Sequence, residues 1–70
     1  MTRVVVSSKK NFTVLQDGQM QSVILNQPSI VQIGVAQSDI KSIIKQGNDL
    51  VITLKNGEKI IINDFFNEMN

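Results

Sequence analysis

Cysteine, histidine, tyrosine and tryptophan are all absent from this 70-residue chain. Without cysteine there can be no disulfide, and without cysteine and histidine there is no zinc site of the usual kind. The same absences remove the commonest catalytic bases and nucleophiles. None of the serines lies in a Gly-x-Ser-x-Gly elbow, and the carboxylates are scattered along the chain. The sequence therefore predicts a protein that is not an enzyme, with no catalytic residue, no metal, no cofactor and no small-molecule substrate.

The chain also lacks any excess of charge. Seven basic and six acidic residues give a net charge of +1, and only Lys9 and Lys10 are adjacent basic residues. Nucleic-acid binding normally requires a basic stripe and exposed aromatic rings, so we predict none. No apolar run approaches the ~20 residues of a membrane helix. The short run Val4–Val6 is too brief for a signal-peptide core, so we expect a cytosolic protein or export without a cleaved N-terminal signal.

Short β-branched runs separated by turn residues make up most of the sequence, and this pattern is typical of β-strands. Residues 1–70 are expected to form a single all-β domain, a small antiparallel β-sandwich or partly open barrel of six to eight short strands. The turns are expected at Ser8–Asn11, Asp17-Gly18, Asn26–Ser29, Gln46–Asp49 and Asn56-Gly57. The candidate strands are Arg3–Ser7, Phe12–Leu15, Ser22–Leu25, Ile30–Val35, Lys41–Lys45, Leu50–Lys55 and Glu58–Asn63.

The last three strands are predicted to form a C-terminal meander. A three-residue loop, Lys55–Gly57 with Gly57 in the left-handed region, places Leu50, Ile52 and Leu54 on one face with Ile60 and Ile62. A two-residue loop at Gly47-Asn48 sets Ile43 opposite Ile52. A 3₁₀ turn is expected at Gln37–Ile40, ahead of the first of these strands.

Four segments admit more than one interpretation. Val4–Val6 and Ile60–Ile62 are interpreted as core strands, with an assembly edge as the alternative. The loop at Asp49 is similar to half of a calcium-binding repeat, but a tight turn is the simpler reading. Phe65 and Phe66 follow the last strand, and alternation buries one ring and leaves the other exposed. These two rings either close one end of the domain or form an interface with a protein partner.

The stretch from Asp39 to Phe66 resembles a known family. Its Gly-Asn-Asp-Leu turn, alternating strand, Lys-Asn-Gly turn and apolar strand ending in Phe-Phe are similar to the N-terminal prefix-like domain of BapA-type biofilm-associated adhesins. The Val-rich start is similar as well.

The resemblance implies a non-catalytic N-terminal module of a much longer surface protein of Gram-negative bacteria. It implies cell adhesion and biofilm formation, type I secretion, and a cell-surface or secreted, outer-membrane-associated location. Expected partners are the following Ig-like repeats, a second copy in a homo-oligomer, or an outer-membrane component, and the role is retention or self-association. The alternative is a free-standing β-module that binds a peptide or protein by strand addition.

Overall fold

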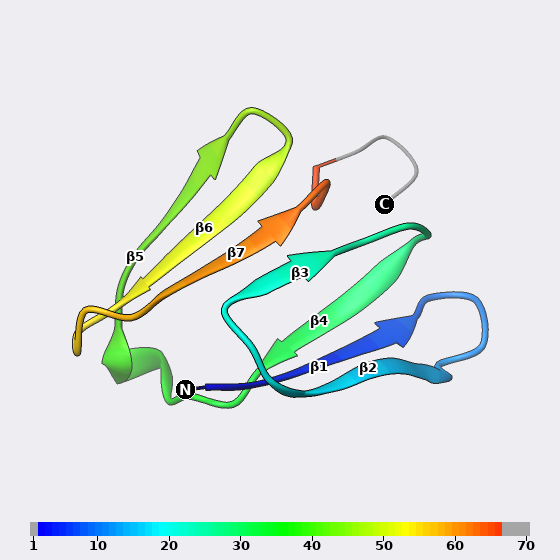
Figure 1. Cartoon of the computed structure of the whole chain (residues 1–70), viewed down its shortest axis with the longest axis horizontal. Helices are drawn as coiled ribbons and strands as arrows, with labels where there is room; N and C mark the ends of the chain where they lie inside the picture. The colour runs from blue at the N-terminus through cyan, green and yellow to red at the C-terminus, as the bar shows by residue number, and fades with distance from the viewer. Residues whose placement is uncertain (1, 67–70) are drawn as a thin grey trace.

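The computed structural model describes residues 2–66 and is all-β, as the sequence predicts. Figure 1 shows two sheets that do not close into a barrel. The three-stranded sheet has the order β2 (Val14–Gln19), β1 (Arg3–Ser8) and β4 (Ser29–Ile33). The four-stranded sheet has the order β3 (Ser22–Ile24), β7 (Lys59–Asn63), β6 (Asp49–Leu54) and β5 (Ile40–Gln46). A single 3₁₀ turn in the described residues, η1 (Gln37–Asp39), precedes β5 as expected.

The hydrophobic core lies between the two sheets. Alternate residues of each strand face it, because successive side chains of a strand point to opposite faces. The eight buried apolar side chains that form one cluster are Val4, Val6, Val23, Leu25, Ile52, Leu54, Ile60 and Ile62. Val4–Val6 and Ile60–Ile62 thus do supply core residues, while their central members Val5 and Ile61 point away from the core and are less buried.

The C-terminal meander has the predicted register. Ile52 lies opposite Ile60 and Leu50 opposite Ile62. The loop Lys55–Gly57 closes through hydrogen bonds from the Gly57 N–H to the Leu54 carbonyl, at 3.0 Å, and from the Leu54 N–H to the Glu58 carbonyl, at 2.8 Å. Gly57 has a φ of +93°, which is the left-handed conformation that the bulged loop requires.

The β5–β6 hairpin also follows the prediction. Ile43 lies opposite Ile52, and the two-residue loop places Gly47 at a φ of +64°. A positive φ at the first loop residue is typical of a type II′ turn, the hairpin turn that favours glycine there. Short turns thus determine the register of all three strands of the meander.

The N-terminal half differs from the sequence prediction at β2. The expected turn at Asp17-Gly18 is wrong, because both residues lie inside β2, opposite Val5 and Val4. The predicted strand Phe12–Leu15 begins too early, since Phe12 is in the preceding loop with a φ of +60°. Pairing along the whole of β1 outweighs the local turn preference of Asp-Gly, and this pairing is a tertiary effect.

Strand β3 departs from a purely antiparallel arrangement. It pairs in parallel with β7, with Val23 opposite Ile62. The Asn63 side-chain amide donates to the Val23 carbonyl at 3.0 Å and to the Ser22 hydroxyl at 3.2 Å. Because β3 crosses to the other sheet, its neighbours β2 and β4 are left on either side of β1. No turn or alternation pattern in the sequence predicts this crossing.

A polar contact joins the start of the chain to the β6–β7 turn. Thr2 donates from its backbone N–H to Glu58 Oε2 at 3.1 Å, and its hydroxyl donates to Glu58 Oε1. Thr2 is buried and Glu58 half-buried. Charge-assisted hydrogen bonds are stronger than neutral ones, particularly away from water. This contact therefore ties the residue that precedes β1 to the meander.

Candidate interaction surface

The two phenylalanines that the sequence singled out lie where β7 ends. Phe65 packs against the core and Phe66 is 40% exposed, so alternation places one ring inside and one outside as expected. The two rings meet edge to face, with centroids 5.1 Å apart and an interplanar angle of 81°. This geometry is favourable for aromatic pairs and fixes the exposed ring against the buried one.

The segment that carries these rings is held to the β5–β6 turn. The Asp64 N–H donates to Asp49 Oδ1 at 3.0 Å, and the Phe66 N–H donates to the Asn48 carbonyl at 2.9 Å. Asp64 has a φ of +62°, which turns the chain back toward that loop. The Asp49 carboxylate therefore has a structural partner. Within residues 2–66 no group of three or more acidic side chains is placed to hold a metal ion.

Phe66 extends toward β5, the outermost strand of the four-stranded sheet. The ammonium of Lys45 lies 5.4 Å from the centre of the Phe66 ring, within cation–π range. Next to Lys45 on β5, Ile43 is 55% exposed and Ile44 is 52% exposed. We call the exposed residues at this margin, Ile43, Ile44, Lys45 and Phe66, the β5 edge surface; Ile44 lies on the outer face of the sheet, and Ile43 and Lys45 lie on the opposite face. Figure 1 shows β5 at the margin of the sheet, with β6 on its inner side.

The outer face of the four-stranded sheet carries an apolar row that sequence reasoning missed. Ile44 on β5, Val51 on β6 and Ile61 on β7 lie directly opposite one another across the three strands. Val51 is buried, whereas Ile44 and Ile61 are exposed. The alternation that buries Ile60 and Ile62 places Ile61 on the opposite face. The outward position of Ile61 could therefore have been predicted from the sequence.

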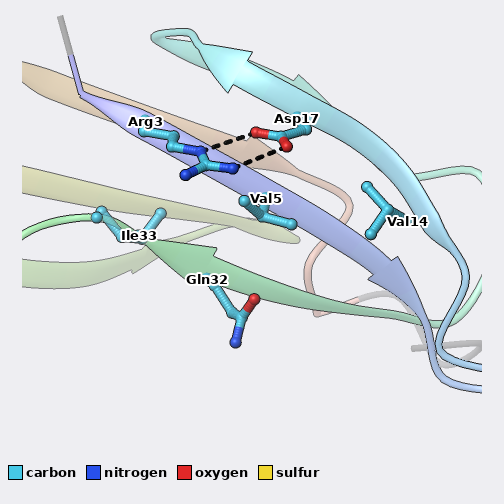
Figure 2. Close-up of a pocket in the computed structure, with 7 residues that line it drawn as sticks. Arg3, Val5, Val14, Asp17, Gln32 and Ile33 are labelled. Atoms are coloured by element: carbon cyan, nitrogen blue, oxygen red, sulfur yellow. Dashed lines mark hydrogen bonds and ion pairs between the residues drawn. The ribbon is translucent and has the colours of Figure 1, made fainter.

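A shallow hollow on the outer face of the three-stranded sheet is a second candidate. Its volume is ≈ 380 Å³, and its lining, most of which Figure 2 labels, is Arg3, Val5, Val14, Asp17, Gln32, Ile33 and Gly34. Arg3 Nε and Nη2 donate to the two oxygens of Asp17, both at 2.9 Å. These hydrogen bonds lower the pKa of the Asp17 carboxyl and raise the pKa of Arg3.

The two charges of the hollow neutralise each other, so the hollow presents no net charge to a ligand. Its other lining side chains are aliphatic or amide groups, which supply neither a nucleophile nor a proton donor for catalysis. The ion pair in the hollow joins Arg3 of β1 to Asp17 of β2.

Over residues 2–66 no helix is long and apolar enough to cross a bilayer.

Comparisons with known proteins give one finding. No curated protein and no solved structure matches the chain. The family described as "BapA, prefix-like domain" matches residues 1–70, the whole sequence. This match extends the resemblance from the C-terminal motifs to the entire chain. The chain belongs to the BapA prefix-like domain family.

Proposed function

We propose that this chain is the non-catalytic N-terminal domain of a bacterial surface adhesin that acts in cell adhesion and biofilm formation. The observation that carries the proposal is the family match over all 70 residues. The lack of histidine and cysteine agrees with a role that involves no chemistry. We place the parent protein at the surface of a Gram-negative cell, associated with the outer membrane after type I secretion.

Two roles are open to a domain at the end of such an adhesin. It can retain the protein at the cell, or it can bring adhesin molecules together. The β5 edge surface favours the second role, because its isoleucines and its sheet margin are exposed. Exposed strand edges with apolar side chains readily accept a further strand.

The test is deletion of residues 1–70 from the parent protein, followed by immunoblotting of cell-surface and medium fractions and by a biofilm assay. Self-association predicts less biofilm with an unchanged amount of adhesin on the cells. Retention predicts that the truncated adhesin moves into the medium. If neither the biofilm nor the surface amount changes, the proposed role in adhesion is wrong.

The alternative function is a free-standing module that binds a peptide by strand addition, and the open edge of β5 is also the observation that favours it. The length of the reading frame distinguishes the adhesin domain from the free-standing module. An adhesin requires that the coding sequence continues past Asn70 into repeats, whereas a free-standing module requires a stop codon there.

A further inference from the structure

We propose that β5 pairs in antiparallel fashion with β5 of a second copy of this chain, about a twofold axis at Ile44. The inference rests on the self-association role proposed above and assigns it to one strand and one register. In this register Ile44 lies opposite Ile44 of the second copy, Ile43 opposite Lys45, and Ser42 opposite Gln46. Two four-stranded sheets then join into one continuous sheet of eight strands.

The backbone of β5 offers the hydrogen bonds that this pairing needs. A two-residue hairpin loop closes on a hydrogen-bonded pair, here Gln46 with Asp49, and such pairs alternate along an antiparallel ladder. Ile44 therefore directs its N–H and carbonyl toward Val51 of β6. Ile43 and Lys45 direct theirs toward the open margin of the sheet. In the proposed register, these two residues form hydrogen-bonded pairs with each other across the twofold axis.

The regular part of β5 is the same segment that pairs in the proposed register. Between Ile40 and Ser42 the pairing with β6 is shifted by a bulge, whereas Ser42–Gln46 pairs regularly, residue by residue. A bulge bends a strand and interrupts the ladder, which discourages pairing on that stretch. A twofold axis at Ile44 matches the five regular residues with the same five residues of the second copy. An axis at Ile43 would bring Lys41 and the bulge into the interface.

Charge discriminates between these two registers as well. An axis at Ile43 places Lys41 directly opposite Lys45 of the second copy, twice in each dimer, and like charges directly opposite are destabilising. An axis at Ile44 places each Lys45 opposite an isoleucine, whose surface the lysine stem can cover. Repulsion between Lys41 and Lys45 therefore disfavours the register with the axis at Ile43. In the register with the axis at Ile44, no lysine lies directly opposite another lysine.

The apolar row on the outer face gives a third, independent reason. Ile44, Val51 and Ile61 are aligned across β5, β6 and β7. Only when Ile44 faces its own copy does this row continue straight into that of the second molecule. The Ile44 pair is then a non-hydrogen-bonded pair, in which the side chains of an antiparallel ladder approach most closely. The exposed half of each Ile44 side chain is covered by the other.

A five-residue strand pair forms a small interface, well under the ~1,200 Å² of a stable complex. We therefore expect weak, reversible dimers of the isolated chain. On a cell surface that carries many tethered copies, effective concentrations in the mM range are typical, and pairing too weak for dilute solution becomes effective.

Single-cysteine variants test the register directly, since the chain contains no cysteine of its own. Ile44→Cys should form disulfide-linked dimers quickly under mild oxidation, because the Cα atoms of such a pair lie ~4.5 Å apart, within the range of a disulfide. Ile43→Cys should link slowly, because the two sites are diagonal and ~7–8 Å apart. Ile24→Cys, at a 67% exposed site on β3, measures random collision. If Ile43→Cys links faster than Ile44→Cys, or if Ile44→Cys links no faster than Ile24→Cys, the proposal is overturned.

Sedimentation measures the association without cross-linking. The chain should dimerise detectably by about 1 mM, the effective concentration of tethered modules. Ile44→Lys should weaken dimerisation by roughly tenfold or more, since it places like charges opposite each other at the axis. Ile24→Lys is the matched control and should dimerise as the unmodified chain does.

A chain that stays monomeric throughout, or an Ile44→Lys variant that dimerises normally, would overturn the pairing. Either result leaves the adhesin assignment standing, because that assignment is tested separately by the deletion in the parent protein.

Discussion

The C-terminal meander and the pairing of β1 with β4 depend on different kinds of contact. In the meander, β5, β6 and β7 follow one another through loops of two and three residues, so each strand pairs with its neighbour in sequence. In the three-stranded sheet, β1 pairs with β4 only after the chain has visited the other sheet through β3. Local turn residues can determine the register of the first arrangement, whereas the second depends on closing a long loop.

Strands of one sheet also differ in how deeply their apolar residues are buried. In the four-stranded sheet the central strand β7 buries Ile60 and Ile62 completely, while the marginal strand β5 leaves Ile43 and Ile44 exposed. The residue type is the same, and so is the sheet. Position within the sheet therefore decides which isoleucines stabilise the fold and which are available to a partner.

The largest expected effect distinguishes these two positions. Ile60→Ala should lower the free energy of unfolding by about 3 kcal/mol, since it removes buried methyl groups and leaves a cavity. Ile43→Ala, in the same sheet but exposed, should change the free energy of unfolding by less than about 0.5 kcal/mol. Urea denaturation followed by circular dichroism gives both values. Should Ile60→Ala leave too little folded protein, Ile60→Val should still lose about 1 kcal/mol. Equal losses at Ile60 and Ile43 would refute the distinction between central and marginal strands.

The contact between Thr2 and Glu58 tests how the start of β1 is joined to the meander. Glu58→Ala removes both acceptors and should lower the free energy of unfolding by about 1–2 kcal/mol. Glu58→Gln keeps one carbonyl acceptor and should lose a smaller amount. Chemical denaturation again measures the effect. A fully stable Glu58→Ala variant would show that apolar packing alone holds the two sheets together.

Two glycine substitutions compare a loop residue at positive φ with a residue inside a strand. Gly57→Ala forces a side chain into the left-handed conformation of the β6–β7 loop and should cost about 1 kcal/mol. Gly18→Ala, in β2, adds a methyl group whose nearest neighbour is Met20 Cε at 3.8 Å, an ordinary contact, so its effect should be near zero or slightly stabilising. Thermal unfolding of both variants checks the difference. A greater loss at Gly18 would contradict the regular strand geometry there.

The smallest effect is expected at the Arg3–Asp17 pair, because both side chains are well exposed to solvent. The pKa of Asp17 is lowered in the folded protein by hydrogen bonds from Arg3. Its contribution to stability is therefore present above the ordinary carboxyl pKa of about 4 and is lost as the pH falls through the lowered value. Asp17→Asn should remove this small part of the acid dependence, which melting curves between neutral and acidic pH would reveal. An unchanged pH profile would mean that the pair contributes nothing to folding.

Sequence reasoning succeeded where the controlling interactions are local. Gly47 and Gly57 determine hairpins whose strands are fixed by burial of alternate isoleucines, and both registers were predictable for that reason. It failed at Asp17-Gly18, a strong turn signal that lies within β2 because pairing with β1 extends past it. The sequence predicted that one ring of the Phe65-Phe66 pair is exposed, whereas the hydrogen bonds that Asp64 and Phe66 donate to the β5–β6 turn were not predictable.

The all-β class, the meander, the absence of the usual catalytic groups and the family were all predictable from the sequence alone. These follow from residue composition, turn chemistry and side-chain alternation, all of which act over a few residues. Three features became known only from the arrangement of residues 2–66 in space: β3 pairs in parallel with β7, Thr2 bonds to Glu58, and β5 is a marginal strand of its sheet. Those features depend on which distant segments come together to bury the core. No short stretch of sequence encodes that choice, because the apolar strands could satisfy their alternation in several sheet orders.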